Sequence, residues 1–380
     1  MTGVAQSMMR ANWVVPPQER PFEGSGGGQT VLGPRRKGMR MYNEDFIDRL
    51  EKGLRAALLD WGLSNETELT LLTISENATF RAADPASGRD VVFRVHRPGY
   101  HSLAEIASEL AWLAALSSEG VVNTLKPVLQ SNGDLIADVD DNGTTRHVVA
   151  FKFLPGYQPD EDDDLSGWFV KLGAITAKLH AHSRDWKRPR GFQRKTWNFE
   201  TMLGATPHWG DWRDALGLTS DGRRVLQDTA ELLRERLADY GEGPAIFGLV
   251  HADLRPANLL ADGDRLSVID FDDCGFSWYL YDFAASISFI EHEPYVPDLL
   301  DAWIDGYTSI APLSDEDMAM IPVFIMLRRM LLTAWIASHS ETLTARRLGE
   351  SYTHGTVALA RAFLAEYAEA EAADAEGAGF

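Results

Sequence analysis

Cysteine is almost absent from this chain. Its 380 residues contain a single one, Cys274, which excludes an internal disulfide framework and a cysteine-rich metal site. Long apolar runs are also missing, since no stretch approaches the ~20 residues that a membrane-spanning helix needs. The first residues lack the positively charged and then apolar pattern of a secretory signal. The cytoplasm is therefore the expected location.

Three widespread catalytic signatures are missing as well. The sequence has no Gly-x4-Gly-Lys-Ser/Thr loop, no Gly-x-Ser-x-Gly elbow and no His-Glu-x-x-His zinc motif. Positive charge is in short supply, because 36 Lys and Arg face 56 Asp and Glu, which gives a net charge of −20. Neither nucleic acid nor an anionic membrane attracts such a surface, so a small cationic or neutral molecule is the expected partner.

The chain is long enough for one large or two ordinary domains with a sizeable core. Residues 1–41 have no periodic apolar pattern and are expected to be a disordered tail, with Met39 or Met41 as an alternative start of translation. The Ala- and Glu-rich residues 368–380 are expected to fray.

The most informative stretch is a pair of polar loops joined by a predicted β-hairpin. Residues 251–258 read His-Ala-Asp-Leu-Arg-Pro-Ala-Asn, and residues 269–273 read Ile-Asp-Phe-Asp-Asp. Apolar residues and an Asp-Gly turn signal between them predict two short antiparallel strands. Such a hairpin returns Asp270 to Asp253 and Asn258, so that three oxygen-bearing side chains converge.

This convergence suits phosphoryl transfer, which needs an acid–base group at the attacking hydroxyl and oxygen ligands for Mg²⁺. Asp253 is predicted to orient the acceptor hydroxyl and to take its proton, and Asn258 and Asp270 are predicted to hold the metal. The spacing from Asp253 to Asn258 is that of kinase catalytic loops. A polar turn between buried strands is the alternative interpretation, which the additional Asn258 and Asp270 disfavour.

These two motifs resemble the aminoglycoside phosphotransferase/choline kinase superfamily. In that family the Asp-Phe-Gly of protein kinases loses its glycine, and Asp272 stands at that place here. The resemblance implies an α+β, two-lobed protein-kinase-like fold that uses ATP and Mg²⁺. It implies a small β-rich lobe over residues 42–153, which binds the nucleotide, and a larger helical lobe over residues 154–367, with the catalytic loop and the acceptor site.

The resemblance also assigns the nucleotide side of the site, which departs from the usual kinase pattern. It places Ser75, Asn77 and Thr79 near the phosphates, but the glycine-rich signature is lacking and an ordinary hairpin tip is the alternative. Arg94, on a predicted strand over 91–96, stands where kinases carry the lysine that pairs with the phosphates. Arginine keeps the positive charge but differs from lysine in reach and geometry. An exposed strand arginine is the alternative interpretation.

The helix after this strand is expected to orient Arg94. It begins with a Ser-x-x-Glu capping box, and Glu109 is the predicted partner of Arg94, with a solvated surface glutamate as the alternative. At the end of the small lobe, backbone groups of Phe151 and Phe153 are expected to meet the adenine edge. The other predicted small-lobe strands cover residues 69–74, 79–81, 121–130, 135–139 and 146–153.

Several other groups are candidates around the catalytic loop. His251 is expected to support its geometry, and Arg255 to neutralise charge near Asp253 or the transferred phosphoryl group. Asp272 and Asp273 are candidates for metal ligation or substrate contact. Arg328 and Arg329 are expected partners of the acidic site region, and the resemblance makes Asp282 a structural support of the loop. The tryptophans of the loop-rich region 184–220 either line the substrate or pack in the core: Trp186, Trp197, Trp209 and Trp212.

The sequence therefore predicts a phosphotransferase that moves the γ-phosphate of ATP to a hydroxyl of a small molecule such as an aminoglycoside or an amino alcohol. One alternative is a protein serine/threonine kinase of the stress-response type, which the Ile-Asp-Phe-Asp-Asp string also resembles. The other is a non-catalytic nucleotide-binding module, which Arg94 and the missing glycine-rich loop suggest. The motifs do not specify the acceptor or the oligomeric state.

Overall fold

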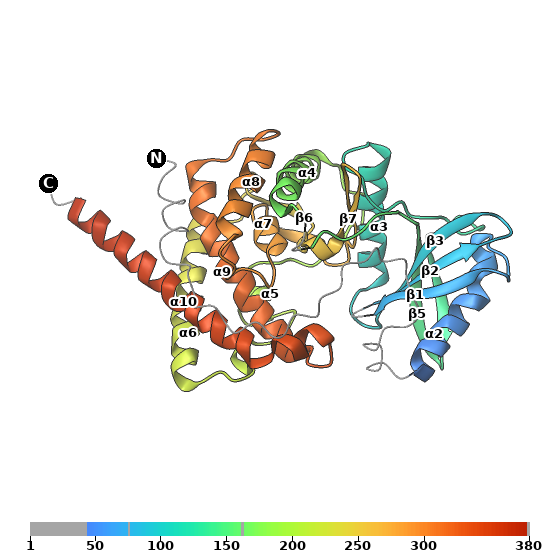
Figure 1. Cartoon of the computed structure of the whole chain (residues 1–380), viewed down its shortest axis with the longest axis horizontal. Helices are drawn as coiled ribbons and strands as arrows, with labels where there is room; N and C mark the ends of the chain where they lie inside the picture. Colours follow the sequence, from blue (N-terminus) through green and yellow to red (C-terminus); the bar gives the residue numbers. More distant parts are fainter. Residues whose placement is uncertain (1–43, 75–76, 161–162, 378–380) are drawn as a thin grey trace.

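An antiparallel sheet of five strands dominates the first part of the molecule (Figure 1). The computed structural model of the chain describes residues 44–74, 77–160 and 163–377. The strand order in the sheet is β1-β2-β3-β5-β4. Its strands are β1 (Glu68–Ile74), β2 (Ala78–Asp84), β3 (Arg89–Val95), β4 (Ile136–Asp141) and β5 (Thr144–Lys152).

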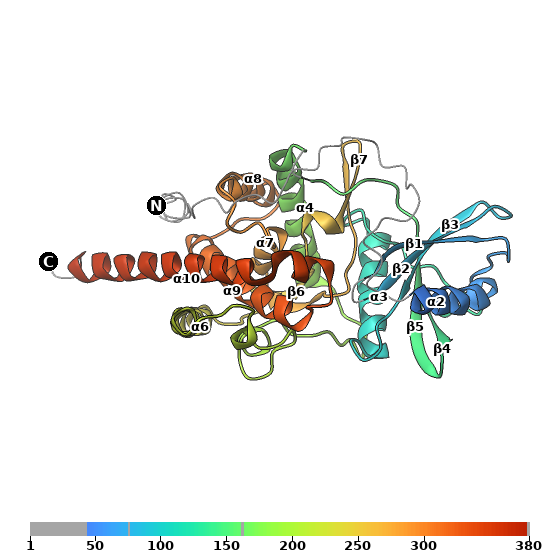
Figure 2. The ribbon, with the colours of Figure 1, turned by 60° about the horizontal axis from the view of Figure 1, so that its bottom comes forward.

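One helix packs on each face of this sheet (Figure 2). Helix α2 (Glu44–Ala57), continued by a 3-10 turn over Leu58–Trp61, covers the outer face, and α3 (Leu103–Ser118) lies on the face toward the rest of the molecule. Strand β5 shows why both faces are apolar, because successive side chains of a strand point in opposite directions. Its Val148 packs in the core with α2, and its neighbour Val149 packs in the core with α3.

The α+β, kinase-like fold class is confirmed, but one predicted strand is wrong. Residues 121–130 form an extended link that makes only isolated bridges, from Thr124 to Val268 and from Pro127 to Phe151. A proline has no N–H to donate to a strand ladder, so a continuous strand is disfavoured here. The link instead ties the sheet to the hairpin beyond the catalytic loop. The boundaries of the two lobes remain a prediction.

The second part of the molecule is mainly helical, with two small two-stranded sheets. Its helices are α4 (Leu165–Asp185), α5 (Phe199–Met202), α6 (Ser220–Tyr240), α7 (Tyr281–Ser286), α8 (Val296–Thr308), α9 (Asp315–Ser338) and α10 (Leu343–Gly377). Its strands are β6 (Phe247–Val250), β7 (Leu259–Asp262), β8 (Arg265–Val268) and β9 (Gly275–Trp278). Strands β7 and β8 form the predicted hairpin between the two polar motifs.

Helices α4 and α8 approach so closely that glycine is required at their contact. A Cβ atom at Gly173 would lie 2.0 Å from the carbonyl oxygen of Trp303, and one at Gly306 would lie 1.9 Å from that of Val170. These distances leave no room for a side chain. The pair holds α4 in place, and α4 carries His180, which reaches the support of the catalytic loop.

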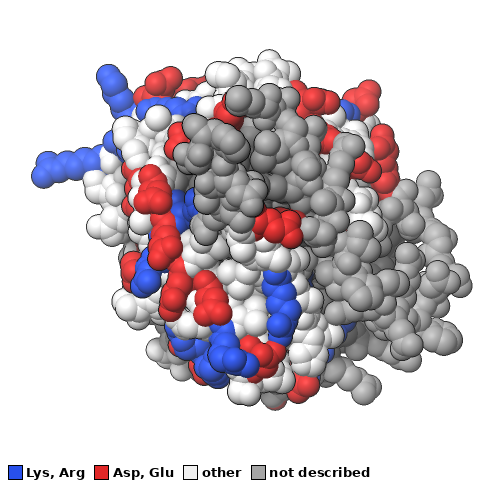
Figure 3. Space-filling model, turned by 90° about the vertical axis from the view of Figure 1, so that its left-hand side faces the viewer, with Lys and Arg blue, Asp and Glu red and all other residues white. Residues whose placement is uncertain are grey.

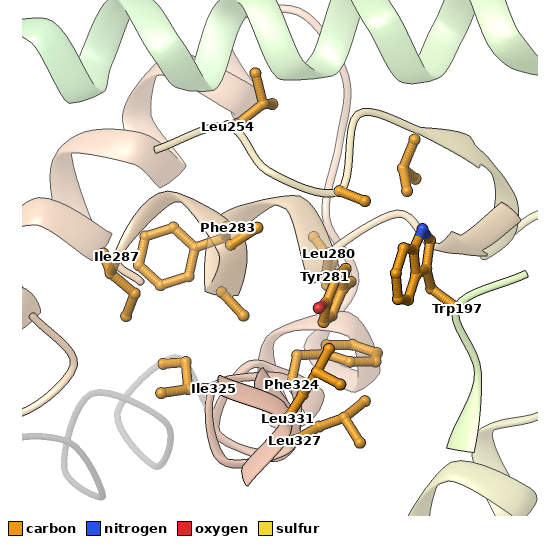
Figure 4. Packing of buried hydrophobic residues seen from close by; sticks show 14 of the residues in the cluster. Trp197, Leu254, Leu280, Tyr281, Phe283, Ile287, Phe324, Ile325, Leu327 and Leu331 are labelled. Carbon is orange, nitrogen blue, oxygen red and sulfur yellow. The ribbon is translucent and has the colours of Figure 1, made fainter. Parts of the chain in front are cut away.

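Helix α9 is the central helix of this core. By length and composition it would pass for a membrane span, but 89% of its most apolar window is buried inside the protein. The expectation that no apolar run approaches a span was therefore wrong, and the cytoplasmic location stays a prediction. Figure 4 shows α7 between α9 and Leu254 of the catalytic loop. The side chains that fill this interface include Phe283, Ile287, Phe324, Ile325, Leu327 and Leu331.

The surface at the helical end carries acidic and basic side chains interspersed among uncharged ones (Figure 3). The visible, described part of this face does not form a broad basic patch. The acidic side chains visible on this face are in keeping with the net charge of −20.

Candidate active site

One buried carboxylate, that of Asp282, accepts hydrogen bonds from the backbone of the catalytic loop. The chain leaves β6 at His251, and Ala252 adopts a positive φ of 67°, which is unusual for a residue with a side chain. Asp282 of α7 accepts the N–H of His251 at 3.2 Å and the N–H of Ala252 at 2.7 Å. His180 of α4 lies 3.1 Å from the same carboxylate. These contacts offset the strain of the turn, which agrees with the supporting role expected of Asp282.

The ring of His251 joins the two polar motifs. Its Nδ1 accepts the N–H of Asp253 at 3.2 Å, and its Nε2 lies 3.1 Å from the carbonyl oxygen of Ile269. The ring therefore carries its proton on Nε2, which donates to that carbonyl. Burial lowers the pKa of His251, so the neutral ring is favoured. This geometry is what the predicted supporting role of His251 requires.

The carboxylate of Asp253 is surrounded by donors. Arg328 donates from Nη2 to Oδ1 at 2.7 Å, Arg255 from Nε to Oδ2 at 3.1 Å, and Asn258 from Nδ2 to Oδ2 at 2.7 Å. Burial alone would raise the pKa of Asp253, but the two guanidinium groups hold it below its usual value. Asp253 is thus an ionised, rigidly oriented group with one lone pair of Oδ1 left for an acceptor hydroxyl.

The two predicted metal ligands lie beside each other at the end of the hairpin. The Asn258 amide donates from Nδ2 to both the carboxylate and the carbonyl oxygen of Asp253, which leaves its Oδ1 to bind a cation. The carbonyl oxygen of Asn258 accepts the N–H of Ile269, which brings Asp270 next to it. Burial raises the pKa of Asp270 to about 6, with Arg94 acting against the rise.

This donor set fits a magnesium ion that is shared with nucleotide phosphates. Mg²⁺ is usually held by one or two protein oxygens together with phosphate oxygens and water. Within the described ranges, no group of three or more His, Cys, Asp or Glu is arranged to hold a metal by itself. A cation between Asn258 and Asp270 would also relieve the unfavourable charge that raises the Asp270 pKa.

Arg94 and Glu109 form a buried ion pair between β3 and α3. Nη1 of Arg94 lies 2.8 Å and 3.0 Å from the two carboxylate oxygens of Glu109. Only 5% of Arg94 and 1% of Glu109 is exposed, so neither is the surface residue that the alternative interpretations assumed. Nη2 of Arg94 also lies 3.6 Å from Asp270, so the predicted phosphate clamp and a predicted metal ligand face the same space.

Asp272 closes this network from the catalytic side. Its Oδ1 accepts a hydrogen bond from Arg94 Nη1 at 3.2 Å, and its Oδ2 lies 3.4 Å from Nε2 of His101. Burial opposes ionisation, but the His101 and Arg94 contacts hold the pKa of Asp272 far below its usual value. Both oxygens of Asp272 therefore face Arg94 or a histidine ring, which disfavours its predicted role in metal or substrate binding.

The predicted phosphate loop is only partly described. Ser75 lies outside the described residues. The side-chain oxygen of Asn77 accepts the N–H of Arg97 at 3.0 Å and so links the start of β2 to the end of β3. Only the amide N–H groups of Asn77 remain for a phosphate. Thr79 pairs with Arg94 in the β2–β3 ladder, which places both side chains on the same face of the sheet.

The hinge expectation needs one correction. The N–H of Phe153 donates to the carbonyl oxygen of Asp90 at 3.1 Å, so this group is not available to an adenine edge. The carbonyl of Phe153 remains a candidate. Phe151 contributes its ring, which lies 5.1 Å from the Arg94 guanidinium carbon. The sequence showed where the strand ends but not which of its hydrogen bonds the sheet would use.

One functional contact was missed entirely. Arg194 is buried in the link after α4 and donates to the carbonyl oxygens of Glu105 at 3.0 Å and Cys274 at 2.6 Å, and also to that of Asp272. It thereby fixes α3 to the loop that carries Asp270 to Asp273. A single arginine in a loop-rich stretch gives no sequence signal for this role.

The tryptophans of this region pack in the core and also make polar contacts at the site. Trp197, Trp209 and Trp212 are all at least 94% buried. The indole N–H of Trp197 donates to the carbonyl of Asp273 at 2.8 Å, and that of Trp209 donates to the hydroxyl of Tyr100 at 3.0 Å. The same side chains can therefore pack in the core and also contact residues of the site.

Several small-molecule kinases are similar to this chain. A model of the phosphotransferase enzyme family matches residues 70–313. Amicoumacin kinase of Bacillus subtilis is 25% identical over 74% of this chain and 83% of its own length. Homoserine kinase of Gluconobacter oxydans is 28% identical over 63% of this chain and 76% of its own length.

Solved structures agree with these sequence matches. A microcompartment-associated aminopropanol kinase is 43% identical, with a TM-score of 0.76 over 82% of this chain and 97% of its own. An amicoumacin kinase in complex with AMP-PNP, Ca²⁺ and Ami has a TM-score of 0.68 at 23% identity, over 84% of this chain and 94% of its own. The chain therefore belongs to the phosphotransferase enzyme family, and it is a kinase that transfers phosphate from ATP, with a divalent metal, to a hydroxyl of a small molecule.

Proposed function

We propose that the acceptor is a short amino alcohol that carries one hydroxyl and one ammonium group. The observation that carries this proposal is the similarity to the aminopropanol kinase, because it extends over nearly the whole length of that protein at 43% identity. The net charge of −20 supports it, since such a protein attracts a cationic molecule more than an anionic one.

In the proposed reaction, Asp253 acts on the acceptor hydroxyl. Its Oδ1 accepts the O–H, while Arg328 and Asn258 keep the carboxylate in one orientation. The hydroxyl oxygen forms a bond to the γ-phosphorus of ATP, the bond from that phosphorus to the bridging oxygen breaks, and ADP leaves. The hydroxyl proton passes to Asp253 as the new bond forms and then to water. Because its pKa is low, Asp253 positions the nucleophile more than it removes a proton early in the reaction.

The remaining residues act on the nucleotide. Mg²⁺, when bound by Asn258 and Asp270, neutralises phosphate charge. Arg94, oriented by Glu109, contacts the phosphates from the small lobe. Arg255 donates to Asp253 and lies partly exposed, which suits a contact with the transferred phosphoryl group.

The proposal is tested by substrate preference. ADP release is measured with 1-amino-2-propanol, ethanolamine, homoserine and an aminoglycoside, and the product is identified as a phosphomonoester by ³¹P NMR. We expect the highest kcat/KM for one of the two short amino alcohols. A tenfold or greater preference for homoserine or the aminoglycoside, or no turnover of either amino alcohol, would overturn the proposal. Protein substrates serve as the comparison for the alternative of a protein kinase.

A further inference from the structure

The carboxylates around the catalytic loop differ in how their charge is matched. Four of them lie within 3.6 Å of an arginine nitrogen, namely Asp253, Asp270, Asp272 and Glu109. Asp273 is the exception: among the described residues, no Lys, Arg or His nitrogen lies within 4.0 Å of its carboxylate oxygens. A carboxylate in a half-buried position without a cation is unfavourable in the empty protein and is a common feature of binding sites.

The carboxylate of Asp273 is held rigidly even though its charge is unmatched. The hydroxyl of Tyr100 donates to Oδ1 at 2.7 Å and accepts the indole N–H of Trp209 at 3.0 Å. This second bond fixes the direction of the hydroxyl, which therefore donates to Asp273 and to nothing else. The backbone of Asp273 is fixed as well, because its carbonyl accepts the indole N–H of Trp197 at 2.8 Å. Within the described structure, Oδ2 of Asp273 receives no hydrogen bond, so it is the oxygen available to a ligand.

The surroundings already accommodate one ammonium group. Nζ of Lys195 lies 3.3 Å from the centre of the Tyr100 ring, a cation–π contact on the face of that ring. This ammonium does not reach Asp273, since its position over the ring keeps it beyond ion-pair distance. It partly compensates the negative charge of the region but leaves the carboxylate itself unpaired. A second small cation is therefore needed to match the charge of Asp273.

A continuous path of contacts connects this carboxylate to the catalytic aspartate. The guanidinium of Arg328 lies 2.7 Å from Asp253 and 5.3 Å from the ring of Trp209. Trp209 donates a hydrogen bond to Tyr100, and Tyr100 donates one to Asp273. The two carboxylates are close enough that the charge of Asp253 disfavours ionisation of Asp273. Asp253 and Asp273 therefore belong to one connected network of side chains.

We propose that Asp273 binds the ammonium group of the acceptor through Oδ2, while the hydroxyl of the same molecule meets Oδ1 of Asp253. This assignment rests on the proposed function, because it requires the acceptor to be an amino alcohol. Tyr100 and Trp209 are positioning residues in this assignment, since they orient the carboxylate. The chemistry recognised is a primary ammonium a few bonds from a hydroxyl.

The test compares 1-amino-2-propanol with 1,2-propanediol, in which a hydroxyl replaces the ammonium. Asp273→Asn keeps the size of the side chain and removes its charge. We expect kcat/KM for the amino alcohol to fall roughly 10- to 100-fold, mainly through KM, because an ion-paired hydrogen bond becomes a neutral one. The value for the diol is expected to change much less, so that the preference for the amine collapses. Binding of 1-amino-2-propanol to the Mg²⁺–ADP complex, measured by calorimetry, is expected to weaken in parallel.

Three further variants make the result interpretable. Asp264→Asn makes the same chemical change at the exposed β7–β8 turn, where Asp264 contacts Lys171, and it is expected to leave the preference intact. Tyr100→Phe removes the hydrogen bond but keeps the charge, so it is expected to weaken amine binding less than Asp273→Asn. If Asp273→Asn does not fold, Asp273→Glu displaces the charge and is expected to reduce the preference.

The outcomes separate the two proposals. If the intact protein shows no preference for the amino alcohol over the diol, the proposed function and the ammonium site both fall. If the intact protein prefers the amino alcohol and Asp273→Asn keeps that preference within about twofold, only the ammonium site at Asp273 is overturned.

Discussion

The catalytic loop and the nucleotide-facing sheet differ in what holds their functional side chains. Asp253 is fixed by neutral and cationic donors, and the backbone of its loop is bonded to Asp282. Arg94 is fixed instead by carboxylates, two of which, Asp270 and Asp272, belong to the opposite lobe. The catalytic half is therefore pre-organised by the protein alone. The predicted nucleotide half is an ion-pair network, and under the proposed role of Arg94 the phosphates of ATP would compete with protein carboxylates for it.

The largest expected effect lies in the catalytic half. Asp253→Asn keeps the shape of the loop and removes the charge that orients the acceptor hydroxyl. We expect kcat to fall by roughly 10²- to 10⁴-fold, with ADP binding retained, because the nucleotide is held from the other side of the cleft. Steady-state ADP release and ADP calorimetry check this. Retention of full turnover would contradict the assignment of Asp253.

The contact between Arg328 and Asp253 is expected to have the next largest effect. Arg328→Lys keeps a charge but loses the fork that bonds Asp253, Ala252 and Tyr281 together. We expect kcat to fall roughly tenfold to a hundredfold, because Asp253 loses its orientation. The guanidinium of Arg328 lowers the pKa of Asp253, so this pKa is also expected to rise in the variant. As the pH is lowered, the variant should therefore lose activity at a higher pH than the intact protein.

The neighbouring Arg329 provides the matched control for this variant. It is as buried as Arg328 but pairs with Glu291 at 2.7 Å, away from the catalytic loop. Arg329→Lys is expected to lower the free energy of unfolding in urea without moving the acid limb of the rate profile. An equal shift of that limb in both variants would mean that the effect of Arg328 is general destabilisation.

Arg94→Lys sharpens the comparison from the nucleotide side. Lysine restores the residue that kinases usually carry, but it has only one nitrogen, whereas Arg94 bonds Glu109 and Asp272 through Nη1 and places Nη2 3.6 Å from Asp270. We expect KM for ATP to rise about tenfold with a smaller change in kcat, since a bond to a charged group is worth about 1.5–3 kcal/mol. A lower KM for ATP would show instead that the carboxylates compete with the phosphates for Arg94 more than they hold it in position to bind them.

The smallest expected effect is a pH dependence of amine binding. Burial, Asp272 and Asp253 raise the pKa of Asp273 to about 7, while Tyr100 and Lys195 act in the opposite direction. Below that pH the carboxyl group is neutral and cannot pair with an ammonium, so KM for 1-amino-2-propanol is expected to fall several-fold as pH rises from about 6 to 8. KM for 1,2-propanediol over the same range serves as the control. Parallel curves for the two substrates would contradict an ionised Asp273 as the amine ligand.

Local sequence carried the prediction of the catalytic half. The spacing of Asp253, Asn258 and Asp270 around an Asp-Gly turn was sufficient, because a tight hairpin fixes the distance between its ends. The capping box before α3 likewise placed Glu109 at the right turn of a helix, and its side chain meets Arg94 as expected. The prediction of a strand over 121–130 was wrong, because apolar composition alone does not show that a partner strand will accept and donate the hydrogen bonds.

The sequence by itself determined the class of reaction and pointed to the groups expected to carry it, because these lie in short motifs whose geometry is set by local backbone structure. Only the tertiary structure decided the state of those groups. Arg328 is 75 residues from Asp253, and Tyr100 is 173 residues from Asp273, so nothing local relates them. Packing of α9 against α7, and of α3 against the second motif, brings these pairs into contact. That packing pairs Asp253 and Asp272 with arginines and leaves Asp273 open to a cation. The sequence does not reveal this difference, because Asp272 and Asp273 are identical residues side by side.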